Sequence, residues 1–107
     1  MKEASKAAKK HFRALAVVAY KRELNKALAA LAAQFDRWKK GELDAFALNE
    51  EVHKYHQGSA RDLYKFYSYG DPSHLVAHAL AAGVLEEKEV DERYLPLLAS
   101  LVEFFTH

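Results

Sequence analysis

The sequence contains no cysteine, which excludes disulfide bonds and thiolate metal sites and makes a reducing cytoplasm the expected location. Proline and glycine are scarce, and neither occurs from residue 5 to residue 39. Long apolar runs are also missing, because the longest nearly uncharged run near the N-terminus covers only residues 14–20. A membrane helix needs roughly 20 apolar residues. We therefore expect no membrane span and no export signal.

The length of 107 residues allows one domain, 1–107, with a single small core. Half of the residues are hydrophobic and 29% are charged, as in ordinary folded chains. The net charge of +1 is unevenly distributed, since residues 1–26 carry a balance of +6 and residues 84–107 a balance of −4. The two ends are expected to attract each other, within one chain or between two.

The first long segment, from about residue 5 to residue 39, consists mainly of strong helix formers and predicts one helix. An apolar seam with coiled-coil spacing runs through its second half: Leu24, Leu28, Leu31, Phe35 and Trp38. Such a helix is about 50 Å long, whereas a compact domain of this size is about 30 Å across. Either the helix breaks near residues 21–25, or its N-terminal half projects and packs on a second copy. We favour the second interpretation, which predicts a homodimer.

Helix-capping residues, glycines and a proline divide the rest of the chain into short predicted helices. Asp44 is a plausible cap for a helix over 45–56 that stops at Gly58. Ser59 would then cap a third helix, so that the two form a hairpin through Gly58. Asp71 and Pro72 predict the start of a fourth helix over 72–82, and Leu97 to Phe105 lie on a last one. No stretch alternates with period two, so the fold class is all-α, a compact bundle of four or five helices with a long N-terminal helix.

The central helices hold four polar residues that are candidates for a ligand cleft: His53, His56, Arg61 and Tyr64. A hairpin through Gly58 would bring the histidines near the tyrosines, and the group would suit an anion or a peptide. The structural alternative is that His53, His56, Tyr64 and Tyr67 are border residues of the core whose polar tips bond to the backbone, Glu or Asp.

Metal binding by His53 and His56 is a further alternative, because Glu50, His53 and His56 follow one another at intervals of three. Glu50 and His56 then lie about 120° apart on the helix and cannot easily share one ion. His74 and His78 are spaced i, i+4, which places them on one helix face. Neither set of histidines completes a metal site, so the main expectation includes no metal and no other cofactor, and metal binding by His53 and His56 remains the second alternative.

Catalysis lacks a supporting motif. Ser59 and Ser73 lie at predicted helix caps, and the sequence has neither a nucleophile elbow nor a phosphate-binding glycine loop. A non-catalytic role is therefore expected. Nucleic-acid binding through the basic N-terminal helix is the main alternative, with Lys9, Lys10 and Arg13 as contacts, although a pI of 8.0 is low for that class.

Four short motifs lie in the middle of the chain: Trp38-x-x-Gly41-Glu42-Leu43, Phe46-x-Leu48, Val52-His53-x-Tyr55-His56-x-Gly58 and Ala60-Arg61-Asp62-Leu63-Tyr64-Lys65-x-Tyr67. Together they resemble a pattern of small uncharacterised bacterial all-helical proteins. The resemblance covers about a third of the chain. It implies a bacterial source and an accessory role in a mobile element or small operon, and it carries no activity.

The function expected from the sequence is a non-catalytic helical module that binds another protein or its own copy. The seam from Leu24 to Trp38 and the face from Leu97 to Phe105 supply more apolar surface than one small bundle readily hides.

Overall fold

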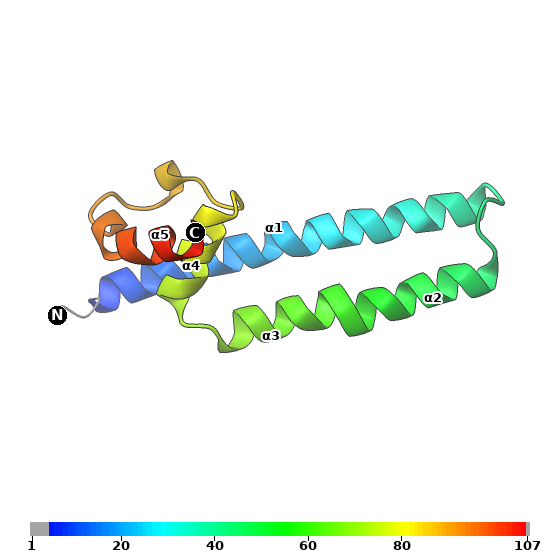
Figure 1. The fold of residues 1–107 in the computed structure, drawn as a ribbon, viewed down its shortest axis with the longest axis horizontal. Helices are drawn as coiled ribbons and strands as arrows, with labels where there is room; N and C mark the ends of the chain where they lie inside the picture. The colour runs from blue at the N-terminus through cyan, green and yellow to red at the C-terminus, as the bar shows by residue number, and fades with distance from the viewer. Residues whose placement is uncertain (1–4, 107) are drawn as a thin grey trace.

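The computed structural model describes residues 5–106 and confirms the all-α prediction. Within that range the regular elements are helices: α1 (Lys6–Lys39), α2 (Ala45–Tyr55), η1 (His56–Ala60), α3 (Arg61–Tyr69), α4 (Pro72–Ala81), η2 (Glu87–Glu89), η3 (Leu95–Leu97) and α5 (Ala99–Thr106). The molecule is elongated, with extents of 57 × 26 × 24 Å, because α1 runs along its whole length (Figure 1).

Helix α1 is continuous from end to end. The Ser5 side chain accepts a hydrogen bond from the Ala8 backbone at its start, and Gly41 follows its end with a φ of +78°. The break considered near residues 21–25 does not occur. The expectation that the N-terminal half projects is also wrong, because that half carries all the buried residues of the helix, from Ala8 to Ala19. The C-terminal half is the one that extends away from the core (Figure 1).

The core lies where α4 packs on the first half of α1 and α5 packs on α4. Phe12 of α1, Val76 of α4 and Leu98, which directly precedes α5, are its largest fully buried side chains. Asp71 caps α4 as predicted, accepting a hydrogen bond from the Ser73 backbone, and Gly83 closes that helix with a φ of +78°. We call this part of the molecule the packed end.

The turn predicted at Gly58 is wrong. Helices α2 and α3 are joined by η1, a π-helical segment, so residues 45–69 form one nearly unbroken helix. Gly58 lies inside this segment and does not have a positive φ, and Ser59 does not cap α3. A glycine in a helix interior costs about 1 kcal/mol relative to alanine, which weakens a helix without ending it. The wider π turn absorbs one extra residue.

This second long helix runs antiparallel to α1, and the two form an arm that extends from the packed end (Figure 1). We define the arm as residues 23–69. Only Leu48 within it is buried, whereas the packed end holds the other buried hydrophobic side chains. The arm is thus held together by contacts that leave most of its apolar side chains partly in water.

A candidate protein-interaction surface

The two sides of the arm differ in what they expose. The residues of α1 that face the second helix are half-covered, among them Ala27, Leu31 and Gln34. One side of the arm has a shallow hollow whose walls include Ala30 from α1 and Lys54 from α2. At 100° per residue, Leu28 lies about 160° from Ala30, and Val52 lies about 160° from Lys54. Leu28 and Val52 therefore both project on the opposite side.

That opposite side, which we call the open face, carries a stripe of large apolar and aromatic side chains. Their exposed fractions run from 36% for Val52 to 67% for Val17. The exposed members are Val17, Leu28, Phe35, Val52 and Tyr64. Trp38 is also exposed, but it lies on the side of α1 that faces the second helix, beyond the end of the covered contact. Along α1 the exposed members Val17, Leu28 and Phe35 lie within about 20° of one another around the helix, so they form one narrow apolar line.

The predicted seam is therefore divided between two roles. Leu24 and Leu31 are partly covered and lie toward the second helix, while Leu28, Phe35 and Trp38 remain more than one third exposed. The intramolecular contact uses small and polar residues of α1, Ala27 and Gln34, alongside these leucines. Two of the five seam residues are thus covered within the chain, and three are left exposed.

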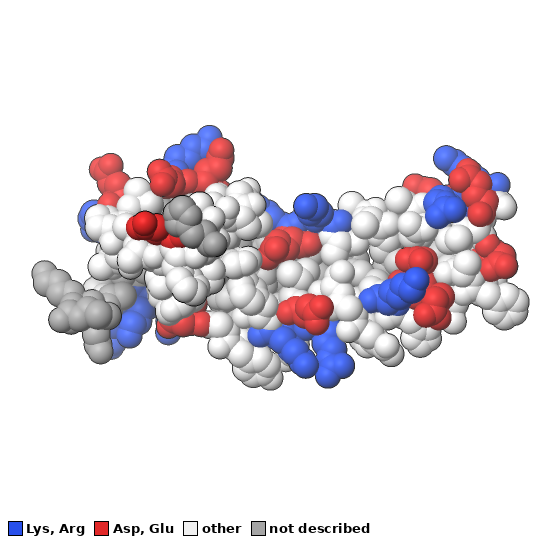
Figure 2. All heavy atoms as spheres, viewed as in Figure 1, with Lys and Arg blue, Asp and Glu red and all other residues white. Residues whose placement is uncertain are grey.

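Charge is distributed unequally around the helices that form the open face. Lys10, Arg13, Lys21 and Lys39 on α1 and Arg61 on α3 lie within about 60° of the apolar stripe on their own helices, once the extra residue of η1 is counted. The acidic residues of α1, α2 and α3 all lie about 80° or more from it: Glu23, Asp36, Glu50, Glu51 and Asp62. On the face that Figure 2 shows, acidic and basic side chains instead lie side by side along the arm.

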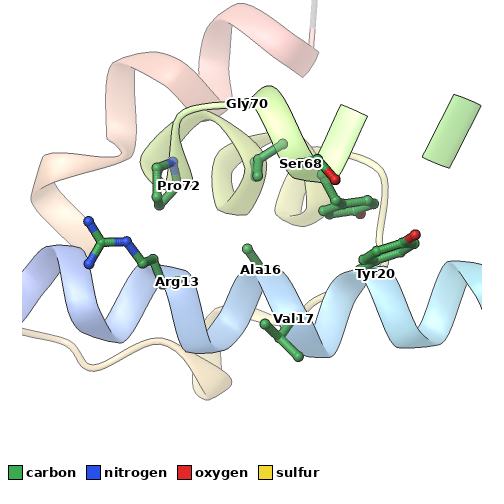
Figure 3. A pocket seen from close by; sticks show the side chains of 9 residues that line it. Arg13, Ala16, Val17, Tyr20, Ser68, Gly70 and Pro72 are labelled. Atoms are coloured by element: carbon green, nitrogen blue, oxygen red, sulfur yellow. The ribbon is translucent and has the colours of Figure 1, made fainter. Parts of the chain in front are cut away.

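A hollow of about 350 Å³ lies beside the stripe where the arm meets the packed end. Arg13 and Pro72 stand at one end of it and Tyr20 at the other (Figure 3). The ring of Tyr20 stacks on Tyr67, with centroids 4.9 Å apart and planes 7° from parallel. This hollow combines apolar walls with one cation, a combination suited to a large apolar side chain next to a carboxylate.

The aromatic wall of this hollow is fixed by a hydrogen bond. The hydroxyl of Tyr67 donates to the carboxylate of Glu23 across the two helices. Partial burial, followed by this bond and the negative charge of Glu23, raises the pKa of Tyr67 well above its ordinary value. Tyr67 therefore stays a neutral donor, and its ring orientation is fixed.

Three of the four candidate cleft residues line one hollow in the structure. His56, Arg61 and Tyr64 line one shallow hollow along the outside of the second helix, together with Gln57 and Ala60, and His53 is not among them. All four are exposed, so the core-border interpretation is wrong for His53, His56 and Tyr64. It holds for Tyr67, which is half-buried and donates its hydroxyl to Glu23. They come together along one continuous helix instead of across a hairpin. Tyr64 and Arg61 belong to the open face, whereas Arg13 and Tyr20 were missed, because only the fold brings α1 beside the α3–α4 turn.

The histidines do not assemble a metal site in the part of the chain that is described. Residues 5–106 contain no group of three His, Cys, Asp or Glu side chains placed to hold an ion. The two histidines of α4 have different surroundings: His74 lies 3.1 Å from the Asp71 carboxylate, and the ring of His78 packs between Phe66 and Phe105.

None of the helices described here is long and apolar enough to cross a membrane. Comparison with protein-family models, with curated proteins and with solved structures finds no match to this chain. The geometry of the open face is therefore the main guide to function.

Proposed function

We propose that the chain is a non-catalytic helical interaction module that binds a protein partner through the open face of the arm. The observation that carries this proposal is that Leu28, Phe35 and Val52 stay exposed on one side of the arm, the part of the molecule that buries least. Large exposed apolar patches on folded proteins mark interaction sites. A third or fourth helix on this face would give the arm the core that it lacks.

The face is testable before any partner is known. An apolar dye such as ANS should bind the wild-type protein and bind less to the double variant Leu28→Lys/Phe35→Lys. A matched control is Ala29→Lys/Asp36→Lys, which places the same side chains on the same helix but turned away from the stripe. Equal dye binding by all three proteins would contradict an accessible open face.

Hydrogen exchange provides a second measurement that needs no partner. Amides of residues 45–60 should exchange faster than those of residues 75–80, because the arm has few buried contacts. Uniformly slow exchange in a monomeric protein would mean that the face is already covered, and the proposal would fail.

A second copy of the chain is the alternative partner. The spacing of Leu24, Leu28, Leu31, Phe35 and Trp38 favours it, since such seams commonly pair with themselves. Sedimentation velocity from 1 to 200 µM distinguishes the two, with the concentrations chosen to bracket ordinary dimer affinities. A dimer that dissociates in the Leu28→Lys/Phe35→Lys variant would establish self-association through this face. An accessory role in a bacterial operon stays a prediction, which the neighbouring genes would test.

A further inference from the structure

We propose that the partner of the open face is an amphipathic α-helix with acidic flanks, supplied by a different protein. This inference rests on the proposed function and adds the chemistry of the partner to it. Three features carry it: the shape of the apolar stripe, the absence of acidic side chains from the face on its own helices, and the hollow beside Arg13.

The shape of the stripe fits a helix. The exposed apolar residues lie on two antiparallel helices, and the axes of packed helices are about 8–10 Å apart, so a third helix can lie along both at once. From Val17 to Phe35 the stripe is about 27 Å long at 1.5 Å per residue. A helix of about 20 residues would cover it, with its own apolar residues at heptad positions.

The basic residues beside the apolar stripe indicate which side chains should flank the apolar side of the partner helix. Basic residues border the stripe on both sides, Lys10, Lys21 and Lys39 along α1 and Arg61 along α3, and no acidic residue of α1, α2 or α3 lies among them. Opposite charges at the edge of an interface speed association and select the right partner. Glu or Asp residues on either side of the partner's apolar stripe would meet these cations.

The same charges disfavour a second copy. In a twofold dimer formed through this face, each copy presents the same surface to the other. The basic borders would then face one another without an acidic residue from these helices between them. Like charges placed opposite each other weaken a helical contact.

Nucleic acid and an anionic membrane also carry negative charge, but the centre of the face does not suit phosphates. Val17, Leu28, Phe35 and Val52 occupy the middle, and none of them can donate a hydrogen bond to a phosphate oxygen. Basic groups lie only along the borders. An amphipathic helix matches both parts, because its apolar side covers the centre and its carboxylates reach the edges.

The hollow at the base of the arm provides an anchor for one end of that helix. Its apolar walls, Val17, Tyr20 and Leu75, would take a Leu or Phe side chain, and Arg13 at its mouth would pair with a neighbouring carboxylate (Figure 3). Buried aromatic and aliphatic anchors next to an Arg are typical of the residues that dominate binding energy at protein interfaces.

The test uses the full-length chain and three labelled synthetic peptides of about 21 residues. Two carry Leu and Phe at heptad positions and differ only in their flanks, which are Glu in one and Lys in the other. The third has the composition of the Glu peptide in an order that breaks the apolar stripe. Fluorescence anisotropy at low salt should show the Glu peptide binding at least about tenfold more tightly than either of the others, and its affinity should fall as salt rises.

Charge reversal on the protein supplies the decisive comparison. The Lys21→Glu/Arg61→Glu variant should lose the preference for the Glu peptide and bind the Lys peptide better. The matched control Lys26→Glu/Lys54→Glu reverses two charges that lie away from the open face, and its preference should be unchanged. Removing apolar groups in Leu28→Ala/Phe35→Ala should weaken the Glu peptide at least about tenfold without changing the preference between flanks.

Five outcomes would overturn the acidic-helix proposal. Equal binding of the Glu and Lys peptides would do so, as would tighter binding of duplex DNA or RNA, or tighter binding of phosphatidylserine vesicles, than of the Glu peptide. A dimer that dissociates in Leu28→Ala/Phe35→Ala would keep the interaction function and identify the occupant as a second copy. If no peptide binds and the dye experiment also fails, both the acidic helix and the proposed function fall.

Discussion

Arg22 and Glu89 form a two-pronged ion pair between the middle of α1 and the connection that leads to α5, with N–O distances of 2.5 and 2.8 Å. The same guanidinium donates to the carbonyl oxygen of Val84. Glu89 in turn accepts a hydrogen bond from the Glu86 backbone. The attraction expected between the basic N-terminal segment and the acidic C-terminal one therefore takes at least one specific form within the chain.

Acid should destabilise the packed end by protonating two carboxylates, Glu89 of this ion pair and Asp91, which is paired with Arg93. The bond from Arg22, then the one from the Glu86 backbone, lowers the pKa of Glu89 to about 2, and the bonds from Arg93 lower the pKa of Asp91 to about 2. A carboxylate whose pKa is depressed by folding binds fewer protons in the folded state, so its stabilisation is present above its unfolded pKa and is lost as pH falls. The melting temperature should therefore drop between about pH 5 and pH 2.

The variant Glu89→Gln checks this assignment by circular dichroism melts across that range. It should be less stable than the wild type at pH 7, and the difference should shrink toward pH 2. Arg22→Lys is the companion variant, since it keeps the charge and loses the two-pronged geometry. A constant difference between wild type and Glu89→Gln at every pH would show that the side chain acts through packing alone.

Gly70 should not tolerate a side chain. A Cβ there would lie 2.5 Å from Leu75 Cδ2 and 2.8 Å from the carbonyl oxygen of Phe66. Gly70→Ala should cost about 1–3 kcal/mol of unfolding free energy, because the turn from α3 into α4 must shift to make room. Urea denaturation measures this cost, and an unchanged midpoint would mean that the close approach is not present in solution.

Gly58→Ala is expected to have the opposite sign. Gly58 has a helical conformation with nothing near its added Cβ, so alanine should stabilise the protein by about 0.5–1 kcal/mol. Gly41→Ala is the control, since Gly41 has a φ of +78° and the same change there should destabilise by about 1 kcal/mol. Destabilisation by Gly58→Ala would support the turn that the sequence suggested.

Alanine substitution of one buried and one exposed valine should distinguish effects on folding stability from effects on binding. Val76 is fully buried in α4, and Val76→Ala should cost about 2 kcal/mol in urea denaturation, because it removes two methyl groups from a packed core. Val17 is 67% exposed on the open face, and Val17→Ala should change stability by less than about 0.5 kcal/mol. If Val17→Ala weakens binding of the Glu-flanked peptide while leaving the urea midpoint unchanged, the residue acts at the interface.

Much of the architecture was predictable because local signals fixed it. Asp44 and Asp71 cap the helices that they were expected to cap, and Gly41 and Gly83 adopt the left-handed conformation that ends a helix. Gly58 was misjudged because a glycine signals a helix end only when the backbone there needs a positive φ. Tertiary packing along α1 outweighed the local preference and carried the helix through.

The open face was only partly predictable. The spacing of Leu28, Phe35 and Trp38 identified an apolar seam, but spacing alone does not say which part of a seam is occupied within the chain. Arg13 and Tyr67 are far apart in sequence, and the hollow that they share exists only because α3 returns along α1. No local pattern marks such a pairing.

The π-helical segment has a consequence for the register of the whole second helix. Its one extra residue turns α3 back by about 100° relative to an uninterrupted α-helix. Without that rotation, Leu63 and Tyr67 would no longer continue the line of Leu48 and Tyr55 along α1. The π-helical segment thus aligns the apolar line of α3 with that of α2, so that both contact α1 along one straight path. Insertions and deletions should therefore be tolerated less well between residues 56 and 60 than their exposure suggests, because each changes the side chains that every later turn presents to α1.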